Sequence, residues 1–339
     1  MKNTLLLLFA VLFAFAGYCQ PAEEYYSQGV TKYNHHDYSG AIGYFTVAIE
    51  HGLKDVDVFN KRGNAKKALQ DHKGAIDDYT SAIGIDANYA KAYNNRGIAK
   101  KALEDYKGAI ADYTKAIEID PKLPDPYYNR GIARYELNDL AGAIDDYTVT
   151  ISIDPRREMA YCNRGLARYD LEEYQAAIED FNKALEIDPF DSDTYINRGN
   201  AKDEMEDHLG AIEDFTMAIK YEPEEGWAYY NRGITKYHLK NYAAAIVDFT
   251  QAIQNNPEDA DAYYNRGNSM YMLEDYTGAI ADYNKSILLE PDGADAYYYR
   301  GMAKSHAGEM AGACLDFKKA AALGYSEAYN AINLNCKQP

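Results

Sequence analysis

Small and apolar residues recur along this chain with a fixed spacing of 34 residues. The clearest marker is a glycine, usually preceded by Asn-Arg, that recurs nine times without insertion or deletion: Gly29, Gly63, Gly97, Gly131, Gly165, Gly199, Gly233, Gly267 and Gly301. A period of this length with helical patterning predicts an array of stacked helix pairs rather than separate globular domains. With the glycine as position 8, the units begin at Ala22, Val56, Ala90, Pro124, Glu158, Ser192, Gly226, Ala260 and Ala294.

Each unit contains the pattern of two helices. Position 4 is always aromatic, position 20 is always alanine, position 24 is always Tyr or Phe, and positions 27 and 28 are mostly alanine and isoleucine. Positions 20, 24, 27 and 28 are therefore apolar at helical spacing. Proline occupies position 32 in six units, and proline ends a helix. We predict a helix A, a tight turn near position 15, a helix B and a proline-marked break.

Glycine at position 8 needs a structural reason, because glycine in a helix costs about 1 kcal/mol relative to alanine. The glycine and the alanine at position 20 are expected to let helices A and B approach closely. Aromatic side chains at positions 4, 17 and 24 would fill the space around that contact.

These residues resemble the tetratricopeptide repeat family, from Ala22 to Glu327. The resemblance implies an all-α fold: a right-handed α-solenoid superhelix of stacked helix hairpins, with a concave groove lined by helix A. The first, second and ninth units have Leu53, Ala87 and Tyr325 at position 32, and terminal units deviate because they meet water. We expect nine repeats over residues 20–327 and a C-terminal capping helix and tail over residues 328–339.

Position 7, commonly leucine in this family, is arginine in all units but the first, and position 23 is aspartate in the same units. Both positions lie eight residues from the turn, so an antiparallel hairpin places them at one height. We predict the ion pairs Arg62–Asp78, Arg96–Asp112, Arg130–Asp146, Arg164–Asp180, Arg198–Asp214, Arg232–Asp248, Arg266–Asp282 and Arg300–Asp316. A buried arginine without a partner would cost several kcal/mol. The alternative is an arginine ladder that binds anionic ligands.

By the family resemblance, helix A faces the groove, and that face is rich in tyrosine and asparagine. The candidate partner-binding residues are Tyr128, Tyr135, Tyr169, Trp227, Tyr230, Tyr237, Tyr264, Tyr271, Tyr298, Asn163, Asn197, Asn231 and Asn265. Tyrosine offers a large contact area with a polar tip, and amides both donate and accept hydrogen bonds. Such a groove suits an extended peptide or a glycan. The alternative is that the tyrosines pack between neighbouring A helices and the asparagines bridge repeats.

The chain contains no sequence motif of an enzyme or a metal site. Gly-x-Ser-x-Gly, a phosphate-binding glycine loop and His-Glu-x-x-His are all missing, and the seven histidines are scattered. An open solenoid also offers no closed site that would perturb carboxylate pKa values. We therefore expect a non-catalytic scaffold without a cofactor or a metal.

The first nineteen residues are expected to lie outside the fold. Lys2 precedes twelve apolar residues, Leu5 to Ala16, a run shorter than the roughly 20 residues that span a bilayer. This arrangement is typical of a secretory signal peptide cleaved before Gln20. A lipoprotein signal with Cys19 lipidated is an alternative, although Tyr18 is larger than the residue expected there, and a retained anchor is another. We expect export from a bacterial cytoplasm to the periplasm, envelope or medium.

The net charge of −18 argues against nucleic acids and anionic membranes as partners, because both are themselves negative. The expected partner is a protein or a peptide, with membrane attachment only through a lipidated Cys19. The alternatives are a glycan- or cell-wall-binding module, or a lipoprotein component of an outer-membrane assembly. Cys162, Cys314 and Cys336 remain after cleavage. Cys314 and Cys336 are the favoured disulfide pair because both lie near the C-terminus; the alternative is three free thiols.

Overall fold

The computed structural model describes residues 20–336, and every regular element in that range is an α-helix. The helices are α2 (Gln20–Asn34), α3 (Tyr38–Glu50), α4 (Val56–Ala68), α5 (His72–Ile85), α6 (Ala90–Lys101), α7 (Tyr106–Ile119), α8 (Pro124–Glu136), α9 (Leu140–Ile153), α10 (Glu158–Asp170), α11 (Tyr174–Ile187), α12 (Ser192–Glu204), α13 (His208–Tyr221), α14 (Gly226–His238), α15 (Tyr242–Asn255), α16 (Ala260–Met272), α17 (Tyr276–Leu289), α18 (Ala294–His306), α19 (Met310–Ala322) and α20 (Glu327–Asn335). The all-α class and the repeated helix hairpin are confirmed. None of these helices is both long and apolar enough to cross a membrane.

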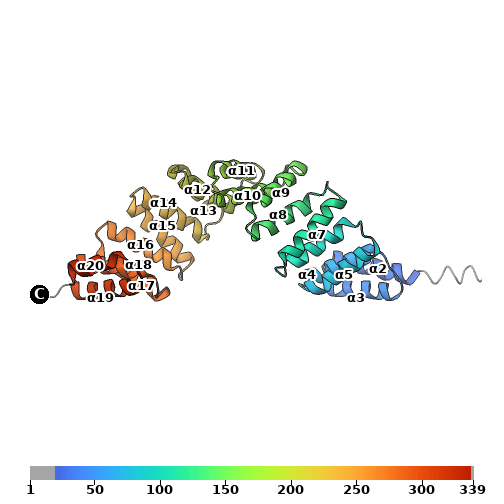
Figure 1. Cartoon of the computed structure of the whole chain (residues 1–339), viewed down its shortest axis with the longest axis horizontal. Helices are drawn as coiled ribbons and strands as arrows, with labels where there is room; N and C mark the ends of the chain where they lie inside the picture. The colour runs from blue at the N-terminus through green and yellow to red at the C-terminus, as the bar shows by residue number, and fades with distance from the viewer. Residues whose placement is uncertain (1–19, 337–339) are drawn as a thin grey trace, which may run out of the picture. The chain divides into compact units, whose positions relative to one another are not determined.

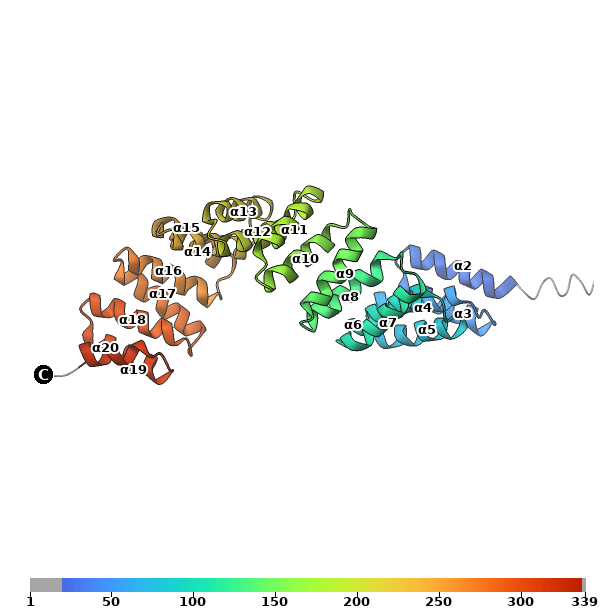
Figure 2. The same cartoon turned by 45° about the horizontal axis from the view of Figure 1, so that its top comes forward.

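The even-numbered helices α2 to α18 are the A helices of the repeats, and the odd-numbered helices α3 to α19 are the B helices (Figure 1). The described part of the chain separates into two compact units, residues 20–167 and 168–336, with the boundary inside α10. We call them the N-terminal and C-terminal units. Within each unit, a B helix packs between its own A helix and the A helix of the next repeat (Figure 2).

The turn between the two helices lies at position 15 and requires a left-handed backbone. Glu104, for example, has φ of 62°, and the equivalent residue of the last hairpin is Gly308 with φ of 82°. Aspartate usually follows and caps helix B: the side chain of Asp105 accepts a hydrogen bond from the backbone N–H of Gly108 at 3.0 Å. The cap satisfies one of the donors that a helix N-terminus leaves unpaired. The turn and the cap together determine where helix A ends and helix B begins.

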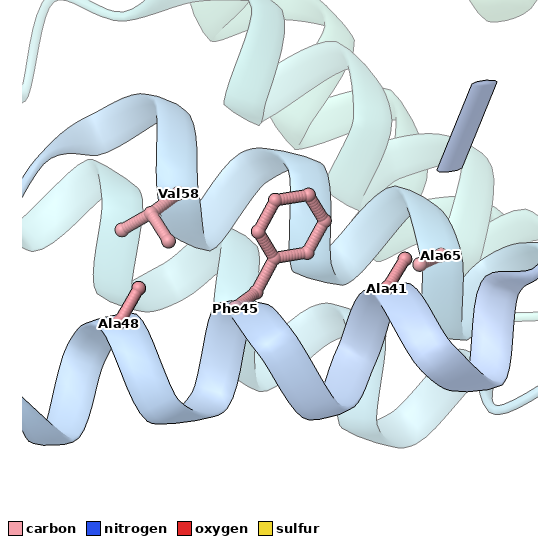
Figure 3. Close-up of a cluster of buried hydrophobic side chains, with 5 residues drawn as sticks. All are labelled: Ala41, Phe45, Ala48, Val58 and Ala65. Carbon is pink, nitrogen blue, oxygen red and sulfur yellow. The ribbon is translucent and has the colours of Figure 1, made fainter. Parts of the chain in front are cut away.

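The hydrophobic core is a series of small clusters, each formed by neighbouring helices. In the first cluster Ala41, Phe45 and Ala48 point from α3 toward Val58 and Ala65 of α4, and all five are fully buried (Figure 3). The alanines leave the helix backbones close together, so that one aromatic ring fills the space between them. Because each cluster joins neighbouring hairpins only, no single hydrophobic core spans the described residues.

The helical glycine at position 8 makes room for that ring. A Cβ atom built on Gly97 would lie 2.6 Å from Cε1 of Tyr113, the position-24 ring of the same repeat, and Gly63 and Gly131 lie similarly close to their rings. The sequence predicted that the glycine and the alanine at position 20 let the two helices approach closely, with the position-24 aromatic filling the space around that contact. The structure places the position-24 ring directly against the glycine. The ring is buried on all sides and cannot turn away, so the position excludes any side chain.

The C-terminal helix α20 follows the ninth hairpin and packs against α19. A disulfide joins Cys314 of α19 to Cys336, directly after α20, with 5.6 Å between the Cα atoms. This is the pair that the sequence favoured. Cys336 packs with Phe317 of α19 and Ala331 of α20, so the bridge holds the end of α20 against α19.

The contact at position 8 predicts opposite effects for two alanine substitutions. Gly97→Ala should lower the free energy of unfolding by about 2 kcal/mol, because the new methyl group overlaps the buried ring of Tyr113. Gly43→Ala is the matched control: a Cβ atom on this exposed glycine of α3 would have nothing within 4 Å, so the change should raise stability by up to about 1 kcal/mol. Urea unfolding followed by circular dichroism measures both, and equal stabilities would contradict the steric explanation.

Candidate functional site

The arginine at position 7 forms a bidentate ion pair with the aspartate at position 23 of its own hairpin. In α6 and α7, Arg96 Nη2 lies 2.6 Å from Asp112 Oδ1, and Nε lies 2.9 Å from Oδ2. Asp112 is only 4% exposed. Paired, parallel hydrogen bonds of this kind fix orientation as well as adding energy. The same contact joins Arg62 to Asp78, Arg130 to Asp146, Arg198 to Asp214, Arg232 to Asp248, Arg266 to Asp282 and Arg300 to Asp316.

Three further contacts of this pair were not predicted. Lys100, at position 11, lies 2.7 Å from the second oxygen of Asp112. Arg96 Nη1 donates to Thr80 Oγ1 of the preceding repeat at 3.1 Å, and the guanidinium lies 5.4 Å from the ring centre of Tyr93. Thus one arginine joins helix A to helix B and also joins two repeats. Two recurrent features of the sequence could have predicted these contacts: Lys or Arg at position 11, and Thr or Asn at position 25.

Arg164 belongs to the N-terminal unit and Asp180 to the C-terminal unit. Within its own unit, Arg164 Nη1 donates to Thr148 Oγ1 at 3.0 Å. Asp180 Oδ2 accepts from Arg168 Nη1 at 2.8 Å. In the other hairpins that carry the pair, the guanidinium bonds its own aspartate and a Thr or Asn of the preceding repeat. This use of the donors favours a structural role over the anionic-ligand alternative.

Several predicted groove residues bond one another between neighbouring repeats. The Asn163 amide donates to the hydroxyl of Tyr128 at 3.1 Å, and the Asn265 amide donates to that of Tyr230 at 3.0 Å. Tyr128 is only 5% exposed, which excludes it from direct contact with a partner in this conformation. Burial, with Asp261 and Asp259 as weaker causes, raises the pKa of Tyr230 to about 12, so this hydroxyl stays protonated. For these four residues the structure matches the bridging alternative.

The tyrosines at position 12 pack edge-on against position-17 tyrosines of the same hairpin. Ring-centre distances are 5.4 Å for Tyr169 and Tyr174, 5.2 Å for Tyr237 and Tyr242, and 5.6 Å for Tyr271 and Tyr276. All three position-12 rings are partly exposed, and burial raises the pKa of each. These rings are therefore held by packing within the hairpin and are only partly accessible. Tyr135, also at position 12, packs on the cluster of Tyr128 and Tyr147.

The remaining candidates differ widely in exposure. Tyr264 packs against Tyr283 and Tyr298 packs against Phe317, with ring centres 6.0 and 5.8 Å apart. Burial raises the pKa of Tyr264. Asn197 is partly buried on α12. Trp227 is 63% exposed and meets the edge of Tyr230 at 5.7 Å. Trp227 is therefore the most accessible of the aromatic candidates.

A pocket of about 290 Å³ lies on the A-helix face of the C-terminal unit. Its lining residues come from the end of α10, from α12 and α14, and from one ring of α13: Tyr169, Asn200, Asp203, Glu204, Phe215, Asn231, Ile234 and His238. Tyr169 and Asn231 were predicted as binding residues; the two carboxylates and the histidine were not. The sequence feature that could have revealed this pocket is at position 12, where Asp203 replaces the tyrosine found in the repeats on either side.

A histidine holds this aspartate in place. His208 Nδ1 lies 2.7 Å from Asp203 Oδ1, and His238 Nδ1 lies 3.9 Å from Oδ2. The pair of Asp203 and His208 thus stands where neighbouring repeats have two tyrosines packed edge to face. Asp203 is shorter than tyrosine, which leaves the space that forms the pocket.

The repeated hairpin defines a class of helical repeat scaffold, and sequence comparison identifies the family. Models of the tetratricopeptide repeat match residues 56–89, 159–191, 226–259 and 260–292, and a model described as TPR repeat matches residues 99–138. The chain belongs to the tetratricopeptide repeat family. This fold is typically a non-catalytic scaffold for protein–protein interaction.

Solved structures with this fold share little sequence with the chain. The Cut9–Hcn1 hetero-tetramer structure of the APC/C matches with 15% identity and a TM-score of 0.52, covering 94% of this chain and 84% of that one. PilF of Pseudomonas aeruginosa matches with 20% identity and a TM-score of 0.53, covering 61% and 94%. YrrB, described as a TPR protein with an unusual peptide-binding site, matches with 23% identity and a TM-score of 0.48, covering 54% and 95%. No curated relative matches significantly. At these identities the likeness establishes the fold alone.

The ion pair of the eighth repeat allows a clean test of its role, because Met270 replaces the basic residue at position 11 there. Asp282→Ala should cost about 3 kcal/mol, since it leaves Arg266 largely buried without its carboxylate. The double change Arg266→Met with Asp282→Leu should cost less than half as much, because no unpaired charge remains. Thermal and urea unfolding compare the two, and a double variant as unstable as the single would show that the charge itself is needed.

Proposed function

We propose that this chain is an exported, non-catalytic scaffold that binds an extended peptide or protein segment along the A-helix face. Within each unit, neighbouring A helices approach one another directly, as the inner wall of a curved stack requires. Recurrent packing within the hairpins occupies the buried aromatic and charged residues. What remains exposed on the A-helix face differs from repeat to repeat, which suits recognition of one particular partner sequence.

The observation that carries this proposal is the combination of an exposed Trp227 with the pocket between α12 and α14. Tryptophan is enriched among the interface residues that dominate binding energy. Three partly exposed tyrosines lie on the A helices of the same unit: Tyr169, Tyr237 and Tyr271. Aromatic anchors and a polar pocket together suit a peptide whose side chains enter separate subsites.

Export is supported by the disulfide between Cys314 and Cys336, because disulfides persist in oxidising compartments and are rare in the cytosol. The proposed signal segment, residues 1–19, lies outside the described residues, as does Cys19, the candidate for lipidation. We therefore rest this part of the proposal on the sequence pattern and on the bridge.

The role of Trp227 can be tested with peptides selected from a displayed random library on the mature chain, residues 20–339. Trp227→Ala should weaken their binding about tenfold or more, as loss of a buried aromatic anchor does. Its melting temperature should not change, because the side chain is mostly exposed. Leu209→Ala is the matched control, a 71% exposed residue of the B helix α13 that should bind as wild type does. Failure to select any peptide, together with Trp227-dependent binding on a glycan array, would favour the glycan-binding alternative.

Export predicts the chemical form of the mature chain. Expressed in full in a bacterial host, the protein should be recovered outside the cytoplasm with Gln20 as its first residue. Its intact mass should lack the two hydrogens that the bridge removes. Mass spectrometry of the fractionated cells measures both. A chain that begins with a lipid-modified Cys19 would support the lipoprotein alternative, and an uncleaved chain in the cytoplasm would contradict export.

A further inference from the structure

The pocket of the C-terminal unit interrupts a regular feature of the A-helix face. In the repeats before and after it, position 12 carries Tyr169 and Tyr237, each packed against a tyrosine at position 17. In the repeat formed by α12 and α13, the same two positions carry Asp203 and His208, hydrogen-bonded at 2.7 Å. The exchange replaces two phenol rings by a carboxylate and a smaller imidazole ring, and it opens a space of about 290 Å³. A change at both positions of one pair indicates a local specialisation.

Two amides that line the pocket have lost the partners that their counterparts use. In other repeats an asparagine at position 9 accepts from the position-24 tyrosine, as Asn268 does from Tyr283 at 2.7 Å. Asn200 instead faces Phe215, which has no hydroxyl. Asparagines at position 6 elsewhere donate to a polar residue of the preceding repeat. The residue in that place for Asn231 is Ile196, whose side chain accepts no hydrogen bond.

The charge of the pocket is negative. Asp203 and Glu204 both line it, and the imidazole of His208 holds Asp203 in place, with Nδ1 2.7 Å from Oδ1. The nearest basic residues of the two A helices are engaged elsewhere: Lys202 lies 2.8 Å from Asp214, and Lys236 lies 2.6 Å from Asp248. The pocket therefore presents two carboxylates without a lysine or arginine among its lining residues. His238 is its one basic side chain.

An aromatic wall completes the pocket. Tyr169 lines it from α10, and burial, followed by the negative charge of Glu204, raises the pKa of this tyrosine. A ring beside carboxylates is a favourable place for a cation, which is attracted by the face of the ring as well as by the charges. The fully buried Phe215 closes the floor with an apolar surface that suits an aliphatic stem.

We infer that this pocket is a subsite for a cationic side chain, arginine or lysine, of an extended peptide partner. The inference deepens the proposed function and rests on it. Carboxylates of Asp203 and Glu204 would bind the charged group, and the oxygens of Asn200 and Asn231 would accept its remaining N–H groups. The volume lies at the lower limit of ordinary ligand pockets, which matches one side chain rather than a whole small molecule. An acidic peptide would be repelled from the same place.

The test compares three forms of the mature chain. A random peptide library is selected on wild type, on Asp203→Asn with Glu204→Gln, and on Glu213→Gln with Glu224→Gln. The last pair removes the same charge from exposed residues outside the pocket lining, and therefore controls for the overall negative charge. Circular dichroism melting verifies that each variant is folded. The single variant Glu204→Gln, at an exposed residue, repeats the test if the pocket double variant melts early.

We expect wild type and the control to enrich peptides with arginine or lysine at one fixed place. Replacing that residue by citrulline, or by acetyl-lysine, should weaken binding at least about tenfold, because a charge-assisted contact is lost. Fluorescence anisotropy measures the dissociation constants of the charged and the uncharged peptide, and comparison of the arginine and lysine versions shows which cation fits better. In the pocket variant these two dissociation constants should differ by no more than about twofold.

Two outcomes would overturn the inference in distinguishable ways. Peptides that bind through Trp227 but show no basic preference, or the same ratio in the pocket variant, would remove the cationic subsite and leave the proposed function intact. Failure of wild type to enrich any peptide would remove both.

Discussion

The ion pair between position 7 and position 23 is the interaction that links the most parts of a repeat, and only the first repeat lacks both residues. One guanidinium joins the two helices of its hairpin through the aspartate, contacts the preceding repeat through a Thr or Asn, and lies over an aromatic ring of its own helix. A lysine or arginine at position 11 supports the same aspartate in most repeats. Because the aspartate is buried, its charge is tolerated only while these partners surround it. The pair therefore specifies hairpin geometry and repeat stacking at once, and the small, discontinuous clusters of apolar residues do not need to do so alone.

The packing requirements of the hairpin also determine which residues remain available for binding. The ring at position 24 needs glycine at position 8, the B helices need alanine to close on their neighbours, and the arginines need their aspartates. These requirements leave little freedom inside a hairpin. On the exposed part of the A-helix face, by contrast, position 12 changes from tyrosine to aspartate and position 2 carries Trp227 without cost to packing. A scaffold built in this way can vary its binding surface while its hairpins stay the same.

The accuracy of sequence reasoning varied with the range of the interactions involved. The two helices of each repeat and the turn near position 15 follow from local spacing, and these were predicted. The pairing of Arg96 with Asp112 follows from the antiparallel hairpin, which is also nearly local. Position on the A helix did not reveal that Tyr128 is buried under its neighbours or that Asn163 uses its amide to hold that tyrosine.

By itself, the sequence determined the family, the number of repeats, the order of helix, turn and helix within each repeat, and the aspartate partners of seven arginines at position 7. It could do so because each of these depends on spacing within one repeat, and nine copies of the same spacing make the pattern unambiguous. Only the tertiary structure decided which polar residues are already used and which are available. That distinction depends on the residue of the next repeat that each side chain meets: Asn265 meets a tyrosine hydroxyl, whereas Asn231 has Ile196 in the corresponding place. The pocket beside Asp203 arises from the same cause, since it requires side chains from three A helices to converge.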